Sequence, residues 1–438
     1  MNNSKTMQYA ESLARLIRVE TISEYDNVNP EKFRAFHQVL RKEFPDFFAN
    51  VEVEDFDGSL LIRWPGKSSE NPILFMNHMD VVGAEGKWKY PPFEPTIVDG
   101  KLYGRGTLDT KGGLWAMLTA ANELCADGFV PEQDIWFESA CTEETTGSGA
   151  DTISLELQKR GITFKMVLDE GGLMIYDPIG GADGTFAMIG VGEKGCADLR
   201  FVATSSGGHA STPEKNSPIV RLAKFIVAAE KSSIFKNELS PTTAEMFRRI
   251  APTMKAPLNK LLGNPDKTEL ILKTLVPSVS ATAAAMFRTT LAFTMAQGSD
   301  GLNVMPDRAW VTGNMRFSHH QGGQASIEAV RRLAAKYDVQ VEIIDPGFES
   351  KISDFHGDGF KKVERTVEKL FPNVKPVPYV TNTASDLRYF DRVSKQCIRF
   401  APFLIDENQL ESIHGVNENI SLEALSPAVD FYKMMMTD

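Results

Sequence analysis

The sequence predicts an α/β protein with two domains, and three observations support this prediction. The chain has 438 residues, which is more than one ordinary hydrophobic core organises. Strand-like and helix-like segments alternate up to about Gly190, which is typical of a layered domain with a largely parallel sheet. Beyond Gly190 the order becomes strand, helix, strand, helix, strand, which suits a smaller α+β domain.

Hydrophobic periodicity supports each element expected in the first domain. Leu13, Leu16 and Ile17 fall on one face of a helix over residues 7–17. Further helices are expected over residues 30–44, 114–127 and 151–159. Apolar runs predict strands at VEVEDF, SLLIRW, PILFMNHMDVV, DIWFESACTEE and FKMVLDEGG. The last three strands end in polar residues, which we expect to meet at one edge of the sheet.

The second domain is expected over residues 190–349, inserted into a first domain formed by residues 1–189 and 350–438. Its strand-like runs are CADLRFVATS, WVTGNMRFS and VQVEIID, and its helical runs are SPIVRLAKFIVAAEK and residues 325–337. An irregular helical segment near residues 233–273 is expected to be a further insertion. From about Phe355, the order helix, strand, helix returns to the first domain.

Composition and charge exclude several classes of function. The sequence is 42% hydrophobic and 24% charged, as in soluble globular proteins. Its 47 basic and 58 acidic residues give a net charge of −11 without a basic cluster, which argues against nucleic-acid binding. We expect no secretory signal and no membrane span, because no apolar stretch is long enough. The 4 cysteines include no CxxC pair, so we expect reduced thiols in a cytoplasmic protein.

Polar side chains follow several of the predicted strands. The stretch GRGTLDTKGG places Asp109 on a glycine-rich loop directly before a helix. A lone Asp in such a loop is more often a turn or cap residue than a ligand, so a metal site is indicated only by joint placement. The residues expected at the shared edge are His78, Asp80, Asp109, Glu143, Glu144, Asp169, Glu170 and, from far downstream, His414.

Two histidines and several carboxylates form a suitable donor set for two divalent metal ions. Zn²⁺ accepts N and O donors, and one carboxylate can bridge two ions about 3.5–4 Å apart. Asp109 suits bridging because its glycine-rich loop allows close approach. Asp80 shares a strand face with His78 and can orient the imidazole. In the Glu143–Glu144 pair, one carboxylate can bind metal while the other accepts a proton from water.

Several motifs occur in order along nearly the whole chain, namely HMDVV, GRGTLDTKGG, TEETTGSGA, VLDEGG, GGHASTP, GLNVMP and IHGVNENIS. In this combination the sequence resembles the co-catalytic di-zinc metallopeptidase family of aminoacylase, carboxypeptidase G, acetylornithine deacetylase and succinyl-diaminopimelate desuccinylase. VLDEGG and the long insertion most resemble the branch of carboxypeptidase S and the N-fatty-acyl-amino-acid hydrolases. The resemblance implies a zinc-exopeptidase-type catalytic domain, a mixed sheet flanked by helices, with an inserted α+β ferredoxin-like lid or dimerisation domain.

The resemblance also implies a set of metal ligands. His78, Asp109 and Asp169 would bind one zinc ion, and Asp109, Glu144 and His414 would bind the other. Co²⁺ or Mn²⁺ can occupy similar sites, because nitrogen and oxygen donors have little selectivity among these metal ions. The peptide bond after Asp109 is expected to be cis.

Catalytic roles follow from the same resemblance. Glu143 would be the general base, and Asp80 would orient His78. His209 would polarise the scissile carbonyl with help from Asn303. In dimeric relatives this histidine comes from the partner subunit, so a homodimer through the lid domain is compatible with the sequence. In a monomer, domain closure would have to bring His209 to the site.

Two arginines are candidates for binding a substrate carboxylate, because a guanidinium can pair with it through two hydrogen bonds. Arg316 in NMRF is the first candidate and Arg388 in SDLRYF the second. Where relatives often carry Gly-Gly-Thr-Asp, this chain has Thr-Ala-Ser-Asp at residues 383–386, which weakens the case for Arg388.

Three functions stay open at this point. The first is a carboxypeptidase or dipeptidase that cleaves short peptides at an amide bond next to a free carboxylate. The second is an amidohydrolase that removes the acyl group from an N-acyl amino acid with the same site. The third is a non-catalytic binding protein on this scaffold, which the full set of ligands and Glu143 disfavour.

Two further motifs are interpreted as structural. GVGEKG at residues 190–195 matches a dinucleotide-binding pattern, but a strand rather than a helix follows it. His319 and His320 stand in SHHQGGQ, which is typical of a surface loop.

Overall fold

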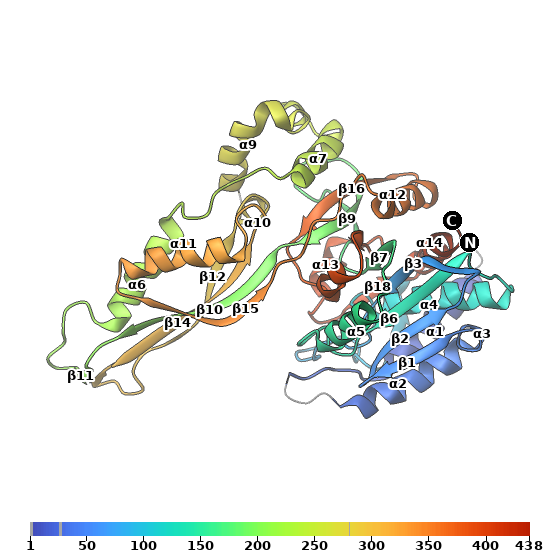
Figure 1. Ribbon diagram of the computed structural model, residues 1–438, viewed down its shortest axis with the longest axis horizontal. Helices are drawn as coiled ribbons and strands as arrows, with labels where there is room; N and C mark the ends of the chain where they lie inside the picture. Colours follow the sequence, from blue (N-terminus) through green and yellow to red (C-terminus); the bar gives the residue numbers. More distant parts are fainter. Residues whose placement is uncertain (1–2, 26–28, 280) are drawn as a thin grey trace.

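The computed structural model describes residues 3–25, 29–279 and 281–438. A broad body is built on a large mixed sheet, and an elongated body extends from it on a separate four-stranded sheet (Figure 1). The predicted α/β class is therefore confirmed, with a separate antiparallel sheet beside the large mixed sheet.

The large sheet brings the predicted polar strand ends to one edge. Strands β3, β6, β7 and β17 are mutually parallel where they pair, so their carboxyl ends share that edge. Along the sheet the order is β1 (Glu52–Phe56), β2 (Ser59–Trp64), β6 (Gln133–Ser139), β3 (Ser68–Met76), β7 (Met166–Asp169), β17 (Cys397–Arg399), β9 (Thr185–Glu193) and β16 (Val374–Thr381), with β8 (Met174–Tyr176) paired to β9.

Helices cover both faces of this sheet. In β3, Phe75 belongs to the hydrophobic core on one face, whereas Leu74 and Met76 belong to the core on the other. Full burial of each such side chain contributes about 1.5–3 kcal/mol. The first face carries α1 (Asn3–Ile17), α2 (Pro30–Glu43), α3 (Pro45–Phe48), α4 (Lys111–Ala126), α12 (Asp358–Leu370) and α14 (Leu425–Thr437). The second carries α5 (Ser148–Lys159) and the 3-10 helix η2 (Asp386–Arg392).

A small three-stranded sheet holds the two loops that carry Asp109 and His414. Strand β5 (Lys101–Tyr103) lies between β4 (Thr96–Val98) and β18 (Asn419–Ser421). The glycine-rich loop follows β5, and His414 lies between α13 (Glu407–Ser412) and β18, which η3 (Leu422–Ala424) follows. Pairing of β5 with β18 therefore brings together two loops that are distant in the sequence.

The second body contains an antiparallel lid sheet. Its order is β12 (Thr290–Gln297), β14 (Arg308–Phe317), β10 (Gly195–Thr204) and β15 (Gln340–Phe348). Helices α6 (Pro218–Lys231) and α11 (Gly323–Ala335) pack on this sheet. The short pair β11 (Gly208–His209) and β13 (Val304–Met305) lies at the end far from the large sheet (Figure 1).

A helical segment over residues 241–285 lies beside the edge of the large sheet. It comprises α7 (Pro241–Ile250), η1 (Ala251–Thr253), α8 (Leu258–Leu262), α9 (Pro265–Val279) and α10 (Ala281–Ala285). Met246 and Phe247 of α7 share a hydrophobic core with Met188 of β9 and Val377 of β16. The segment thus extends beyond residues 233–273. Helix α7 packs on the large sheet, although its sequence lies within the range expected for the lid. No helix of the described ranges is long and apolar enough to cross a bilayer.

Candidate active site

Asp109 lies at the centre of a cluster of carboxylates and imidazoles at the shared sheet edge. Its Oδ1 is 3.1 Å from His78 Nε2, and its Oδ2 is 3.0 Å from His414 Nε2. His414 Nε2 also lies 3.1 Å from Glu144 Oε2. One ligand atom from each of His78, Asp109 and Glu144 falls within 4.8 Å of the others. The peptide bond between Asp109 and Thr110 is cis, as the resemblance implied.

The donor set fits divalent metal ions. It combines imidazole nitrogens with carboxylate oxygens, which suits Zn²⁺. Glu144 Oε1 is buried and has no hydrogen-bond partner among the described residues, so this oxygen has a lone pair to offer. Burial raises the pKa of the Glu144 carboxyl, and the nearby Asp109 carboxylate raises it further. A cation in the cluster would remove both costs.

The pKa values of both histidines in the cluster are raised by neighbouring carboxylates. Hydrogen bonds to Asp109 and Glu144 raise the pKa of His414 to about 10. Burial lowers the pKa of His78, but hydrogen bonds to Asp109 and Asp80 outweigh this effect and raise it well above its usual value. Because a metal ligand must be unprotonated, metal binding has to displace protons from these rings.

Glu143 lies beside the cluster without joining the Asp109 contacts. Its Oε2 is 3.9 Å from His78 Nε2. Burial raises the pKa of Glu143 well above its usual value. A buried carboxylate at this position can exchange a proton with a water molecule or substrate at the cluster.

Asp80 connects the ends of two strands. His78 Nδ1 lies 3.0 Å from the backbone oxygen of Asp80 and 3.3 Å from its Oδ1. The same carboxylate accepts hydrogen bonds from the backbone N–H groups of Glu143 at 3.3 Å and Glu144 at 3.1 Å, and from Ser23 Oγ at 2.7 Å. Asp80 therefore orients the imidazole and also anchors the Glu143–Glu144 loop.

Sequence reasoning missed Glu418 as a functional residue. Its fully buried carboxylate accepts hydrogen bonds from the N–H groups of Gly106 (2.9 Å), Leu108 (2.7 Å) and Asp109 (3.1 Å). It also pairs with Arg105 Nη1 at 2.8 Å. Glu418 belongs to the IHGVNENIS motif, but nothing in the motif indicates a loop 310 residues earlier.

The VLDEGG stretch is oriented differently from the expected ligand set. Asp169 Oδ2 accepts a hydrogen bond from the backbone N–H of Leu387 at 3.2 Å. Glu170 instead lines the cavity at the cluster, together with Asp109 and Glu144. Burial raises the pKa of Glu170, and Asp109 is the strongest of the charges that raise it further. The sequence paired the two residues at the strand end, but only the structure indicates which carboxylate faces the cluster.

A cavity of about 820 Å³ extends from the cluster to the helical segment. Its cluster side is formed by Asp109, Glu143, Glu144, Glu170 and His414. Much of the remaining wall is apolar and includes Leu173, Ile175, Ile179, Met188, Met246, Met286, Ile352, Leu410 and Ile413. His319 and His320 also line the cavity, so the loop that the sequence suggested as a simple surface loop contributes to the site.

His209 and Asn303 lie away from the cluster. Both are at the far end of the lid, where His209 pairs with Val304 and the backbone oxygen of Asn303 accepts a hydrogen bond from Ala210 at 2.9 Å (Figure 1). His209 is exposed, and its Nδ1 lies 2.8 Å from Ser211 Oγ. The structure brings these two residues together but does not bring them to the cavity.

The two candidate arginines are also absent from the cavity lining, as far as the described residues go. Arg316 Nε donates to Asn314 Oδ1 at 3.1 Å on β14. Arg388 lies between the rings of Phe348 and Tyr389, 4.7 and 4.6 Å from their centroids. Its guanidinium therefore helps to join the lid strand β15 to η2.

The fold and the cluster define a metal-dependent hydrolase of peptide or amide bonds. Residues 74–438 match the model of peptidase family M20/M25/M40, and the chain belongs to this family. The cluster provides candidate metal donors in His78, Asp109 and Glu144.

Comparison with individual proteins agrees with this assignment. The chain is 31% identical to human N-fatty-acyl-amino acid synthase/hydrolase PM20D1, over 96% of this chain and 86% of the relative. It is 30% identical to probable carboxypeptidase S-like 2 of Dictyostelium discoideum, over 97% and 84%. The metallo-carboxypeptidase Sso-CP2 of Sulfolobus solfataricus has the same fold, with a TM-score of 0.73, 17% identity and 98% coverage of both chains. The resemblance stated from the motifs is confirmed.

Proposed function

We propose that the protein is a di-zinc hydrolase that cleaves the amide bond of an N-acyl amino acid whose acyl group is long and apolar. The observation that carries this proposal is the apolar wall of the cavity, which begins at the cluster and continues to the helical segment. Short peptides were the first hypothesis from the sequence. The cavity shifts the preference, because an extended apolar wall suits an alkyl chain better than a polar backbone.

The cluster residues would hold two metal ions. His78, Asp109, Glu144 and His414 are the donors, with a further carboxylate from the Asp169–Glu170 pair. When bound, the ions would lower the pKa of a water molecule and polarise the substrate carbonyl. Co²⁺ or Mn²⁺ would support similar chemistry with the same donors.

Glu143 carries the proton in this proposal. It accepts a proton from water as the new C–O bond forms at the carbonyl carbon. It then delivers that proton to the nitrogen as the C–N bond breaks, so that the products are a carboxylic acid and a free amine. Asp80 keeps Glu143 in place through the backbone contact described above.

The apolar wall sets the expected preference for acyl length. Each buried CH₂ contributes about 0.8 kcal/mol, which corresponds to about a fourfold gain in kcat/KM if the gain is realised in the transition state. Acyl chains too short to reach the apolar side chains of the helical segment should show little gain in kcat/KM. The human relative at 31% identity is named for N-fatty-acyl amino acids, which supports the same substrate class.

A short apolar peptide is the second candidate, because the cavity also contains polar side chains. Ser318, Thr381 and Thr383 line it and can form hydrogen bonds with a peptide backbone. The Dictyostelium discoideum relative is named as a probable carboxypeptidase. Both candidates place a free carboxylate next to the scissile amide.

The test compares two panels on chelated and zinc-restored protein. One panel carries acetyl, octanoyl and hexadecanoyl groups on the same amino acid, and the other consists of dipeptides and N-blocked dipeptides. The proposal predicts zinc-restored hydrolysis with kcat/KM rising along the acyl series. A preference for peptides would select the second candidate, and no hydrolysis of either panel would contradict both.

A further inference from the structure

We propose that Lys194 binds the free carboxylate of the substrate, at the point where the large sheet continues into the lid sheet; this proposal depends on the proposed function. Lys194 connects β9 to β10, and its backbone N–H donates to Thr381 O at 2.9 Å. Only 3% of its surface is exposed. It belongs to the GVGEKG stretch, which is interpreted as structural from the sequence alone.

Lys194 brings a positive charge to the same cavity as the cluster. Among the described residues that line this cavity, it is the single lysine or arginine. The other charged side chains there include the carboxylates of Asp109, Glu143, Glu144 and Glu170. A substrate whose scissile amide lies at the metal-binding cluster carries its free carboxylate next to that amide, and Lys194 is the lysine that the cavity offers to this carboxylate.

The ammonium group of Lys194 has an unused donor. Nζ donates to the backbone oxygens of Ala285 at 3.1 Å and Arg288 at 2.8 Å. An ammonium has three N–H donors; among the described residues two of them are used, which leaves the third for a ligand. Among the described residues, the hydrogen bonds of Nζ go to these backbone oxygens and not to a carboxylate. A buried cation without an anion is costly, and a bound carboxylate would offset this cost.

The surroundings of Lys194 favour an anion. Burial lowers the pKa of its amine to about 8, and the charges of Arg316 and Arg288 add to this effect. His319 also lines the cavity, where its Nε2 lies 2.9 Å from Ser350 O. Arg316, which the sequence suggested as the carboxylate ligand, thus strengthens the positive field, while Lys194 contacts the cavity.

The same helical segment connects the carboxylate site with the apolar wall. Ala285, whose backbone oxygen holds Nζ, is followed by Met286, which lines the cavity. One carboxylate oxygen is sufficient for the single free N–H group. The arrangement therefore suits a monoanionic substrate with an apolar group, such as an N-acyl amino acid or an apolar peptide.

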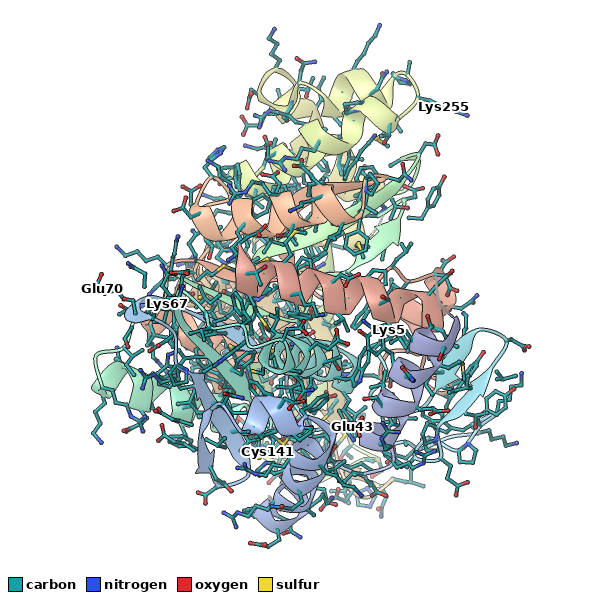
Figure 2. The ribbon with its side chains drawn as sticks, turned by 90° about the vertical axis from the view of Figure 1, so that its right-hand side faces the viewer. Lys5, Glu43, Lys67, Glu70, Cys141 and Lys255 are labelled. Atoms are coloured by element: carbon teal, nitrogen blue, oxygen red, sulfur yellow. The ribbon has the colours of Figure 1, made fainter. Side chains whose placement is uncertain are left out.

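The test uses Lys194→Met with a matched pair of substrates, an N-acyl amino acid and its carboxamide. The unmodified protein should prefer the free acid. The variant should lose about 10- to 100-fold in kcat/KM for the acid, mainly through KM, and little for the carboxamide, because a charge-assisted hydrogen bond is removed. Lys255→Met is the matched control, since Lys255 lies at the outer surface of the helical segment (Figure 2).

The proposal is overturned if Lys194→Met keeps the preference for the free acid. It is also overturned if Arg316→Met loses this preference while Lys194→Met does not. If Lys194→Met does not fold, amine acetylation of the unmodified protein replaces it, with mass spectrometry of Lys194. The free amino-acid product should protect Lys194, and its carboxamide should not; equal labelling overturns the proposal. If the unmodified protein hydrolyses neither the acid nor the carboxamide, that result contradicts the proposed function. The labelling experiment still decides the role of Lys194 in that case.

Discussion

The two sides of the cavity are built in different ways. The cluster side consists of loops whose polar groups are fixed by many hydrogen bonds, with Asp80 and Glu418 each holding several backbone N–H groups. The opposite wall consists of apolar side chains held by packing, such as Met246 against the core that contains Met188. Directional contacts place reactive atoms within tenths of an ångström, whereas packing sets shape and volume. Substitutions should therefore abolish chemistry on the first side and change substrate choice on the second.

The largest effect is expected at Glu143. Glu143→Gln keeps the shape of the side chain but removes the proton acceptor, so kcat should fall by about 10³-fold or more while metal content stays unchanged. Activity assays with metal analysis of the same samples check this. Glu70→Gln on the surface is the control (Figure 2). Activity within a few-fold of the unmodified protein would remove Glu143 from the mechanism.

Metal binding should depend strongly on pH. His414 in the metal-free protein has a pKa of about 10, above its ordinary 6.5, so this proton stabilises the metal-free fold fully below pH 6.5 and ceases to do so as pH rises through about 10. Metal has to displace this proton, so apparent affinity should rise by up to about tenfold per pH unit between pH 7 and 9 for each histidine that loses a proton. Competition with a chelator at several pH values measures this. A flat profile would show that His414 is unprotonated in the metal-free protein.

Glu418 should have an effect of intermediate size. Glu418→Gln leaves N–H groups of the Asp109 loop without their charged acceptor, so metal affinity should fall by about 10- to 100-fold. Excess zinc should restore much of the activity, which a general folding defect would not allow. Glu423→Gln, at an exposed position five residues later, is the control. Unchanged metal affinity would contradict the role assigned to Glu418.

The smallest effect is expected on the apolar wall. Met286→Trp adds volume where the helical segment borders the cavity, so kcat/KM for a hexadecanoyl substrate should fall by about tenfold while an acetyl substrate changes little. The exposed Met295→Trp on the lid is the matched control. An equal loss on both substrates would mean that the wall does not contact the acyl chain.

Much of the fold could be predicted because its signals are local. Residues 30–43 form the expected amphipathic helix, and the apolar run from Ile73 to Met76 forms a strand buried on both faces. The cis peptide bond after Asp109 and the approach of His414 to Asp109 also agree with what the motifs implied. Local periodicity could not show that α7 packs on β9 and β16, because a helix with one apolar face fits either sheet.

The sequence by itself determined the α/β class, the order of the elements and the family, and it indicated candidate metal donors, since each is encoded in short motifs and periodic apolar positions. Only the tertiary structure decided that Glu170 faces the cavity, that Glu418 holds the Asp109 loop, and that Lys194 rather than Arg316 lines the cavity. The physical reason is that hydrogen bonding and burial of these side chains depend on segments up to 313 residues apart, whose meeting no local pattern encodes.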